Sequence, residues 1–347
     1  MSAAGGLARA LDERLGVSEL TYQVPRHANT VAYSLGGIAA MGLLILIASG
    51  ILLAQFYHPM PQFANASVRA MMQSVRAERI VRGIHYWAAQ LVVVTVLLHV
   101  IRVFVTGSFK KPREANWIIG VGLLGVTIGL FFTGTVLKWD QEGFEALEHN
   151  VAIGEVLGRL GSWFTPGFTA NVSILLRLYI AHVSILPGIL LLLLLAHFWL
   201  VKRHGLSGRH GESGDQMLPF SAHVTHLGRY SLVLLGVVLG LAVLLPPAVG
   251  PAPVEGIEVT NPPWPFLPLF AFENWVGIPG LLWATVATFA LLLLVPLADR
   301  APMTAPRGRP LPVAVWFIVL VVLIGLGILA WLTPGAEHVG GFLRGLS

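Results

Sequence analysis

Long apolar runs separated by short polar loops make up most of the chain. Each run reaches the roughly 20 residues that a helix needs to cross the hydrocarbon layer of a membrane. The pattern therefore predicts an all-α integral membrane bundle of seven transmembrane helices. We expect these helices near residues 31–56, 81–106, 115–137, 174–201, 230–250, 278–298 and 312–333.

Composition supports the membrane assignment and narrows the chemistry. Hydrophobic residues form 55% of the 347-residue chain and charged residues 11%, which excludes a soluble globular domain. The chain has no cysteine, which excludes disulfides, iron–sulfur ligation and thioether-attached haem. The net charge of +5 arises largely in short loops beside the apolar runs. We expect contact with membrane lipid and no nucleic-acid partner.

The distribution of basic residues predicts an orientation. Lys and Arg are more frequent on the side of the N-terminus, as at Lys110, Lys111 and Arg113, than on the other side. The positive-inside rule then places the N-terminus in the cytoplasm and, after seven crossings, the C-terminus outside. Residues 1–30 are expected to form a short amphipathic segment on the cytoplasmic surface of a bacterial membrane. We expect no signal peptide, because the residues from Leu11 to Arg26 lack its apolar core.

Two of the apolar runs each carry two histidines at nearly equal spacing. One run has His85 and His99, and the other has His182 and His197, whose interval is one residue longer. Both intervals are about four helical turns, so the histidines of a run share one face and lie ~21 Å apart along the helix. Four such imidazoles can bind one metal at each of two levels, as electron transfer across a bilayer requires.

Glycines repeat the shorter interval in two other runs. The separation of Gly36 and Gly50 equals that of His85 and His99, and so does the separation of Gly120 and Gly134. A glycine inside a helix costs about 1 kcal/mol, and in membranes it commonly allows two helices to approach closely. The shared interval also indicates room for one flat macrocycle at each level.

An arginine lies close to three of the four histidines. Arg82 precedes His85, Arg102 follows His99 and Arg177 precedes His182. A cation in an apolar helix needs an anionic partner, which could be a haem propionate or a lipid headgroup reached by snorkelling. A lone histidine is more often a buried core residue, but the matched set predicts two non-covalent b-type haems with bis-histidine ligation.

Several short motifs resemble one family. The runs Arg82-Gly-Ile-His85-Tyr-Trp, His99-Val-Ile-Arg102 and Trp139-Asp140-Gln141 resemble the cytochrome b of quinol:cytochrome c oxidoreductases. The longer interval in the second histidine run resembles the b6f-type form. The resemblance implies a cytochrome b6-like four-helix di-haem domain at residues 1–210 and a subunit IV-like three-helix domain at residues 211–347.

The same resemblance implies partners and pairings. His85 would pair with His182 around an outer haem, and His99 with His197 around an inner one. It also implies a homodimer, a quinone pocket near each haem, exchange with the quinone pool, and Rieske-type or c-type cytochrome partner subunits. In the b6f-type family a cysteine that attaches a further haem occupies the position of Ser34, so we expect no such haem here.

The loop before residue 268 departs from the family pattern. The family has Pro-Glu-Trp-Tyr, whereas this chain has Pro262-Pro-Trp-Pro265, so Pro263 replaces the glutamate that would accept a quinol proton. Proline cannot act as a general base. Trp264, with Phe266 and Phe270, could still frame a pocket for a quinone.

Other side chains could take over the proton transfer. At the outer site the candidates are Asp140 and Glu273, with Glu142, Glu145, Glu148 and Glu258 as further acids. At the inner site the candidate is His204, with Lys202, Arg203, His223 and His226 as others. For each of these residues an ordinary position on a solvated surface is the more common alternative.

The sequence thus predicts the electron-transfer subunit of a quinol oxidoreductase complex. One alternative is a cytochrome b conduit without a bifurcating quinol site, linking the quinone pool to a multihaem cytochrome c. Another is a haem-bearing scaffold or transporter, although a transporter is expected to have helices broken at mid-depth.

Overall fold

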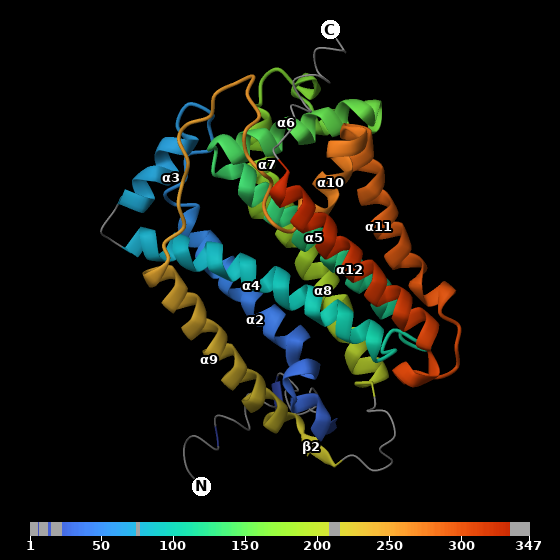
Figure 1. Cartoon of the computed structure of the whole chain (residues 1–347). Coiled ribbons are helices and arrows are strands. Elements are labelled where there is room, and N and C mark those ends of the chain that lie inside the picture. The colour runs from blue at the N-terminus through green and yellow to red at the C-terminus, as the bar shows by residue number, and fades with distance from the viewer. Residues whose placement is uncertain (1–5, 7–12, 15–22, 74–76, 208–215, 334–347) are drawn as a thin grey trace.

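The computed structural model describes residues 6, 13–14, 23–73, 77–207 and 216–333 (Figure 1). Within these ranges seven helical segments are long and apolar enough to cross a membrane, which confirms the predicted all-α membrane bundle. They are α2 (Val31–Leu53), α4 (Ala77–Val105), α5 (Glu114–Leu137), the continuous segment α7 to α8 (Ile174–His204), α9 (Phe220–Leu244), α11 (Ile278–Ala298) and α12 (Pro310–Leu332).

Shorter elements lie at the two ends of the bundle. The helices α3 (Ala64–Gln73), α6 (Gln141–Val156) and α10 (Leu267–Val276) gather at one end, which we call the α6 end (Figure 1). The strands β1 (Gln23–Pro25) and β2 (Met217–Pro219) pair antiparallel at the other, the strand end. Single 3₁₀ turns occupy Arg26–Asn29, Gly158–Leu160, Ser162–Phe164, Pro166–Phe168 and Pro306–Gly308.

The fifth span differs from its predicted bounds. It was expected at residues 230–250, but α9 runs from Phe220 to Leu244. Its first turns contain His223 and His226, whose polarity hid the helix from a hydropathy pattern. The helix ends before Pro246 because a proline disfavours helical geometry in the residue before it.

The fourth span is helical throughout but changes its winding. A π-helical turn at Ala181–Ile185 separates α7 (Ile174–Ile180) from α8 (Leu186–His204). Pro187 lies just after this turn. A proline has no N–H to bond the carbonyl of Val183, and its ring would clash with that carbonyl in a regular α-helix. A wider turn at this position avoids the clash.

Helix packing creates a frame of four helices with two flanking groups. The helix α2 packs against α4, and α5 packs against α8. Leu43, Val92 and Leu190 form a buried apolar layer that joins α2, α4 and α8, midway between the two histidine levels. The helix α9 covers α4 and α2. The helix α10 packs against both α11 and α12, and α11 reaches α5 and α6.

Buried charges tie the C-terminal helices to the first four spans. At the strand end Lys110 donates to a carboxylate oxygen of Asp299 at 2.8 Å, and Arg309 donates to the other. Arg309 also donates to the carbonyls of Phe104 and Val105 in α4. Buried polar contacts therefore join the loop between α4 and α5 to the loop between α11 and α12.

Candidate functional site

The structure brings the four histidines together as two pairs. His85 on α4 faces His182 in the π turn, with ring centroids 6.3 Å apart and ring planes at 65°. His99 and His197, deeper toward the strand end, are close enough to interact electrostatically. The pairs that the family resemblance implied are thus the pairs that share a level.

Each of the four histidines faces one of the four glycines Gly36, Gly50, Gly120 and Gly134. A methyl group added to the glycine would lie against Cε1 of the imidazole, closer than ordinary van der Waals contact at three of the four positions. The distances are 3.0 Å for Gly36 and His99, 3.1 Å for Gly134 and His182, 3.3 Å for Gly50 and His85, and 3.7 Å for Gly120 and His197. The glycines therefore leave space beside the rings.

Hydroxyl groups select the tautomer of the pair at the α6 end. The Ser49 hydroxyl donates to the carbonyl of Ile45 and lies 2.9 Å from Nδ1 of His85. The Thr133 hydroxyl likewise donates to the carbonyl of Gly129 and lies 2.8 Å from Nδ1 of His182. Because each hydroxyl proton is already used, the ring must donate from Nδ1. Nε2 of both rings then carries the lone pair that a metal binds.

Among the described residues no hydroxyl group restrains the other pair, although the main chain of Asn116 lies close enough to interact with the ring of His197. Nδ1 of His99 and Nδ1 of His197 are buried without a hydrogen-bond partner. The glycine spaces and the facing imidazoles fit a flat metal macrocycle at each level, held by two axial imidazoles.

The π turn explains why the two histidine intervals differ by one residue. In a regular helix the extra residue between His182 and His197 would rotate one ring by about 100° relative to the other. A π turn holds one more residue per turn, because its hydrogen bonds join residues five apart. The π turn at Ala181–Ile185 accommodates the extra residue without this rotation, so the rings of His182 and His197 both face α4.

The three arginines near the histidines bind main-chain carbonyls. Arg82 donates to Pro247, and Arg102 donates to Ala32 and Tyr33. Arg177 donates to the carbonyls of Trp163 and Thr165, while its Nε is buried without a partner. Arg177 thus retains one free donor for an anion, and the expected contact of these arginines with haem propionates stays a prediction.

Asp140, proposed for the outer quinol site, holds neighbouring backbone in place. Its carboxylate caps α6 through the N–H of Gly143 and accepts from the N–H of Gly250 at 3.0 Å. It also lies 3.4 Å from the ammonium of Lys138. Trp139 before it adopts φ of 52°, a left-handed conformation that is rare outside glycine. This local geometry fixes the start of α6 against the loop that follows α9.

Trp264 and Glu273 have different partners from Asp140. The indole N–H of Trp264 donates to the side chain of Gln90 in α4 at 2.7 Å. The carboxylate of Glu273 is fully buried and lies 3.0 Å from Nε2 of His149 on α6. The three candidates for the outer site therefore contact different elements instead of forming one cluster.

His149 was not singled out by the sequence, yet it joins two of the candidate acids. Its Nε2 lies 3.3 Å from Glu258 as well as 3.0 Å from Glu273, and its Nδ1 lies 2.7 Å from the carbonyl of Glu145. Burial opposes the charged imidazolium, but the contacts with Glu258 and Glu273 outweigh it and raise the pKa of His149 to about 10. The group is a buried, charged cluster at the α6 end.

The candidates for the inner site lie at the strand end. His204 ends α8, and its carbonyl accepts from Arg113 at 3.1 Å. On α9, Nδ1 of His223 bonds the side-chain oxygen of Asn29 at 2.7 Å. The remaining candidates are the exposed Lys202 and Arg203 at the end of α8, and His226 on α9.

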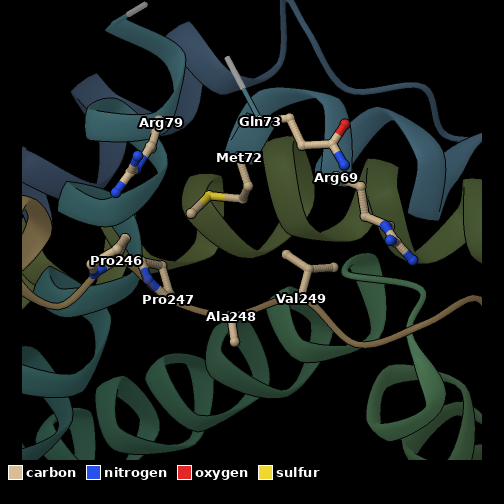
Figure 2. Close-up of a pocket in the computed structure, with 8 residues that line it drawn as sticks. All are labelled: Arg69, Met72, Gln73, Arg79, Pro246, Pro247, Ala248 and Val249. Atoms are coloured by element: carbon tan, nitrogen blue, oxygen red, sulfur yellow. The ribbon is translucent and has the colours of Figure 1, made fainter. Parts of the chain in front are cut away.

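A cavity of about 290 Å³ opens at the α6 end, between α3, the start of α4 and the loop after α9 (Figure 2). Its lining residues are Arg69, Met72, Gln73, Arg79, Pro246, Pro247, Ala248 and Val249. None of the four paired histidines and none of the predicted quinone-site residues lines it. The cavity is therefore separate from the candidate site.

Comparisons with known proteins agree with this geometry. The family model described as cytochrome b/b6/petB matches residues 20–205. Cytochrome b6 of Heliobacterium modesticaldum is 35% identical over 207 residues, which cover 57% of this chain and 97% of that protein. The menaquinol:cytochrome c reductase cytochrome b subunit of Geobacillus thermodenitrificans is 37% identical over 214 residues, covering 57% of this chain and 96% of that protein.

One solved structure extends the similarity to the C-terminal helices. A chain of a hyperthermophilic respiratory complex III superposes with a TM-score of 0.80 at 25% sequence identity. The match covers 97% of this chain and 94% of that chain. The arrangement of all seven spans is thus shared with a respiratory complex.

Proposed function

Because this chain belongs to the cytochrome b/b6 family, we propose that it holds two b-type haems, one between each histidine pair. Members of the family are electron-transferring membrane subunits of quinol:cytochrome c reductase-type complexes, and this chain is such a subunit. The proposed ligands are His85 with His182 near the α6 end, and His99 with His197 near the strand end.

The observation that carries the proposal is the matched contact of every histidine with a glycine on a neighbouring helix. Ordinary close packing of helices does not require that each glycine face an imidazole. The hydroxyls of Ser49 and Thr133 add a chemical argument, since they leave Nε2 of His85 and His182 free to bind iron.

The chain's own residues would prepare and separate the two sites. When bound, each haem supplies one-electron transfer. Ser49 and Thr133 orient the rings at one level, and the free Nε of Arg177 can donate to a propionate. The layer of Leu43, Val92 and Leu190 excludes water between the levels, so that charge crosses the membrane by electron transfer and not by ions.

Quinone exchange is proposed at both ends of the bundle. The α6 end, with Trp264 and Glu273, would face outward and oxidise quinol, while the strand end near His204 would face the cytoplasm. A Rieske-type or c-type cytochrome partner would take an electron outside, within a homodimeric complex. The relative described as a menaquinol:cytochrome c reductase subunit supports a quinol as electron donor.

Absorption spectra of histidine variants test the haem assignment. We expect His85→Ala with His182→Ala to remove one b-type component, and His99→Ala with His197→Ala to remove the other. The variant His85→Ala with His99→Ala should lose both, whereas the exposed His58 can be changed to Ala as a control without loss. Retention of both components after His85→Ala with His99→Ala would disprove the ligand assignment.

Pro263 favours a second candidate function, an electron conduit without a bifurcating quinol site. In that case the chain would pass electrons one way between the quinone pool and a multihaem cytochrome c. The purified complex distinguishes the two. A Rieske subunit together with quinol oxidation that responds to outer-site inhibitors supports bifurcation, whereas a partner set of c-type cytochromes alone supports the conduit.

A further inference from the structure

A long segment at the proposed outer quinol site contains no titratable side chain. Residues 259–272 include none, and a glutamate stands at each end, Glu258 before the segment and Glu273 after it. Both glutamates approach the same atom, Nε2 of His149, at 3.3 Å and 3.0 Å. The fold therefore brings the only acids that flank this segment to one buried histidine.

The geometry requires a shared proton in this cluster. Nδ1 of His149 must carry a proton, because the carbonyl oxygen of Glu145 can only accept. Ionised carboxylates can also only accept, so Nε2 or one carboxyl group must carry a second proton. The single Nε2–H cannot point at Glu258 and Glu273 at once. One carboxylate is thus always left as a proton acceptor.

The cluster also carries a net negative charge that favours uptake of a proton. An imidazolium with two carboxylates sums to one negative charge, and the side chain of Glu273 is 0% exposed. Neither Oε1 nor Oε2 of Glu273 makes a hydrogen bond of good geometry. One added proton would make the cluster neutral, and a buried neutral cluster is more stable than a charged one.

Aromatic contacts connect the cluster to the haem pair proposed at the α6 end. The ring of Phe270 lies 6.3 Å from His149, and Phe266 lies 6.1 Å from both Phe131 and Phe132 on α5. The next residue on α5, Thr133, bonds His182. An apolar quinone head bound along these rings would therefore lie between the acid cluster and His182.

We propose that Glu273, together with His149, is the proton acceptor for quinol oxidation at the α6 end. The inference rests on the proposed function of the chain. The O–H bond of a quinol hydroxyl breaks, a carboxyl O–H bond forms on Glu273, and the electron pair stays on the quinol oxygen. The quinolate gives one electron to a haem and one to a partner redox subunit. Its second O–H bond breaks in turn, and that proton enters the same cluster once the first proton has left, so that quinone is released.

Neighbouring acids provide a path for the proton to leave. From Glu273 it passes through Nε2 of His149 to Glu258, which lies in the loop before the segment and has a side chain that is 7% exposed, compared with 0% for Glu273. Glu148, on the same helix as His149, is the next acid. Burial and the carboxylates of Glu145, Glu258 and Glu255 raise the pKa of Glu148 to about 7, against the opposing effect of His149. Glu255 is exposed and completes the path.

The test compares pH profiles of quinol oxidation by the purified complex. We expect Glu273→Gln to lower kcat about 100-fold, in line with the loss of a general base, and to remove the acidic limb of the profile. His149→Gln should also lower kcat and shift that limb, whereas Glu273→Asp should restore part of the rate. Glu155→Gln, the same change at an exposed position of α6, is the matched control.

Haem spectra of each variant separate a lost base from a lost fold. If Glu273→Gln fails to assemble, the Glu273→Asp variant tests the inference instead. A lowered rate with a shifted pH profile in that variant supports the inference, and an unchanged profile overturns it. A Glu273→Gln complex with full haem and the wild-type rate and profile overturns this inference alone. If the wild-type complex with both haems oxidises no quinol at the α6 end, the proposed function and this inference both fail.

Discussion

Two hydroxyl side chains decide which ring nitrogen of His85 and His182 is free. We expect Thr133→Val to weaken haem retention at that level about 10- to 100-fold, as loss of a ligand's supporting hydrogen bond does in other metal sites. The reduced-minus-oxidised spectrum should show one altered b-type component and one unaltered component. Ser49→Ala should act at the same level through His85.

Thr127→Val is the matched control for this prediction. Thr127 lies on the same helix, is equally buried, and its hydroxyl donates to the carbonyl of Leu123. If Thr133→Val and Thr127→Val give the same spectrum and the same haem content, the hydroxyl of Thr133 does not select the tautomer of His182.

At the residue scale, the sequence predicted the features that recur at a fixed interval. It did not predict contacts between residues that lie far apart in the chain. The histidine and glycine intervals could be read because about four helical turns return a side chain to nearly the same face. A serine or threonine on an apolar helix usually bonds the carbonyl four residues earlier, so the sequence offered no reason to expect Ser49 and Thr133 beside the histidines. However, Ser49 directly precedes Gly50 and Thr133 directly precedes Gly134, and this shared position was a signal that the sequence contained. His149 gave none, because Glu258 and Glu273 meet it only through the fold.

At the element scale the π turn sets the register of the fourth span. Inserting one alanine after Leu190, in regular helix, would rotate His197 by about 100° away from His99. We expect this insertion to remove one b-type component, seen in the absorption spectrum of the purified protein. Deletion of Ser184 with Pro187→Leu should convert the π turn to regular helix and make this histidine interval equal to that of α4.

The deletion variant is the informative comparison, because both changes alter the span by one residue. It should keep both b-type components, because His85 and His99 on α4 already have the shorter interval and face the two levels. Loss of a component in the deletion variant as well would show that chain length alone, and not the register of the rings, controls haem binding. The sequence displayed the unequal intervals, but the position of the compensating turn depended on Pro187 and required the structure.

At the scale of the whole molecule the sequence predicted the spans but not how the C-terminal helices attach. Hydropathy finds helices that face lipid, and it carries no information on which helices are neighbours. The structure shows α9 on one side of the four-helix frame and α10 to α12 on another. We therefore propose that residues 1–210 and 211–347 are separate units whose helices pack together and are also joined by buried polar contacts, among them Lys110 with Asp299 and Arg309 with the carbonyls of Phe104 and Val105.

Splitting the chain tests this organisation. We expect fragments 1–210 and 211–347, produced together, to copurify with haem. Arg309→Met should reduce recovery of the assembled pair about 100-fold, because it removes the hydrogen bonds to Phe104 and Val105 in the other fragment and takes one of two cations from the buried Asp299. Removing one partner of a buried ion pair costs about 3 kcal/mol or more. Arg300→Met is the control, since Arg300 is exposed and its Nε donates to the carbonyl of Leu297. Equal recovery of both variants would show that Arg309 does not join the units.

Asp299, which pairs with Lys110 across the two fragments, gives their assembly a pH dependence of known sign. Burial alone would raise the pKa of Asp299, but Lys110 and Arg309 outweigh it and hold that pKa below its usual value. A lowered carboxyl pKa stabilises the folded form above the normal value of about 3.9 and loses this contribution as the pH falls. The wild-type fragments should therefore separate more readily below about pH 4, whereas the Arg309→Met fragments should show a smaller change over the same range.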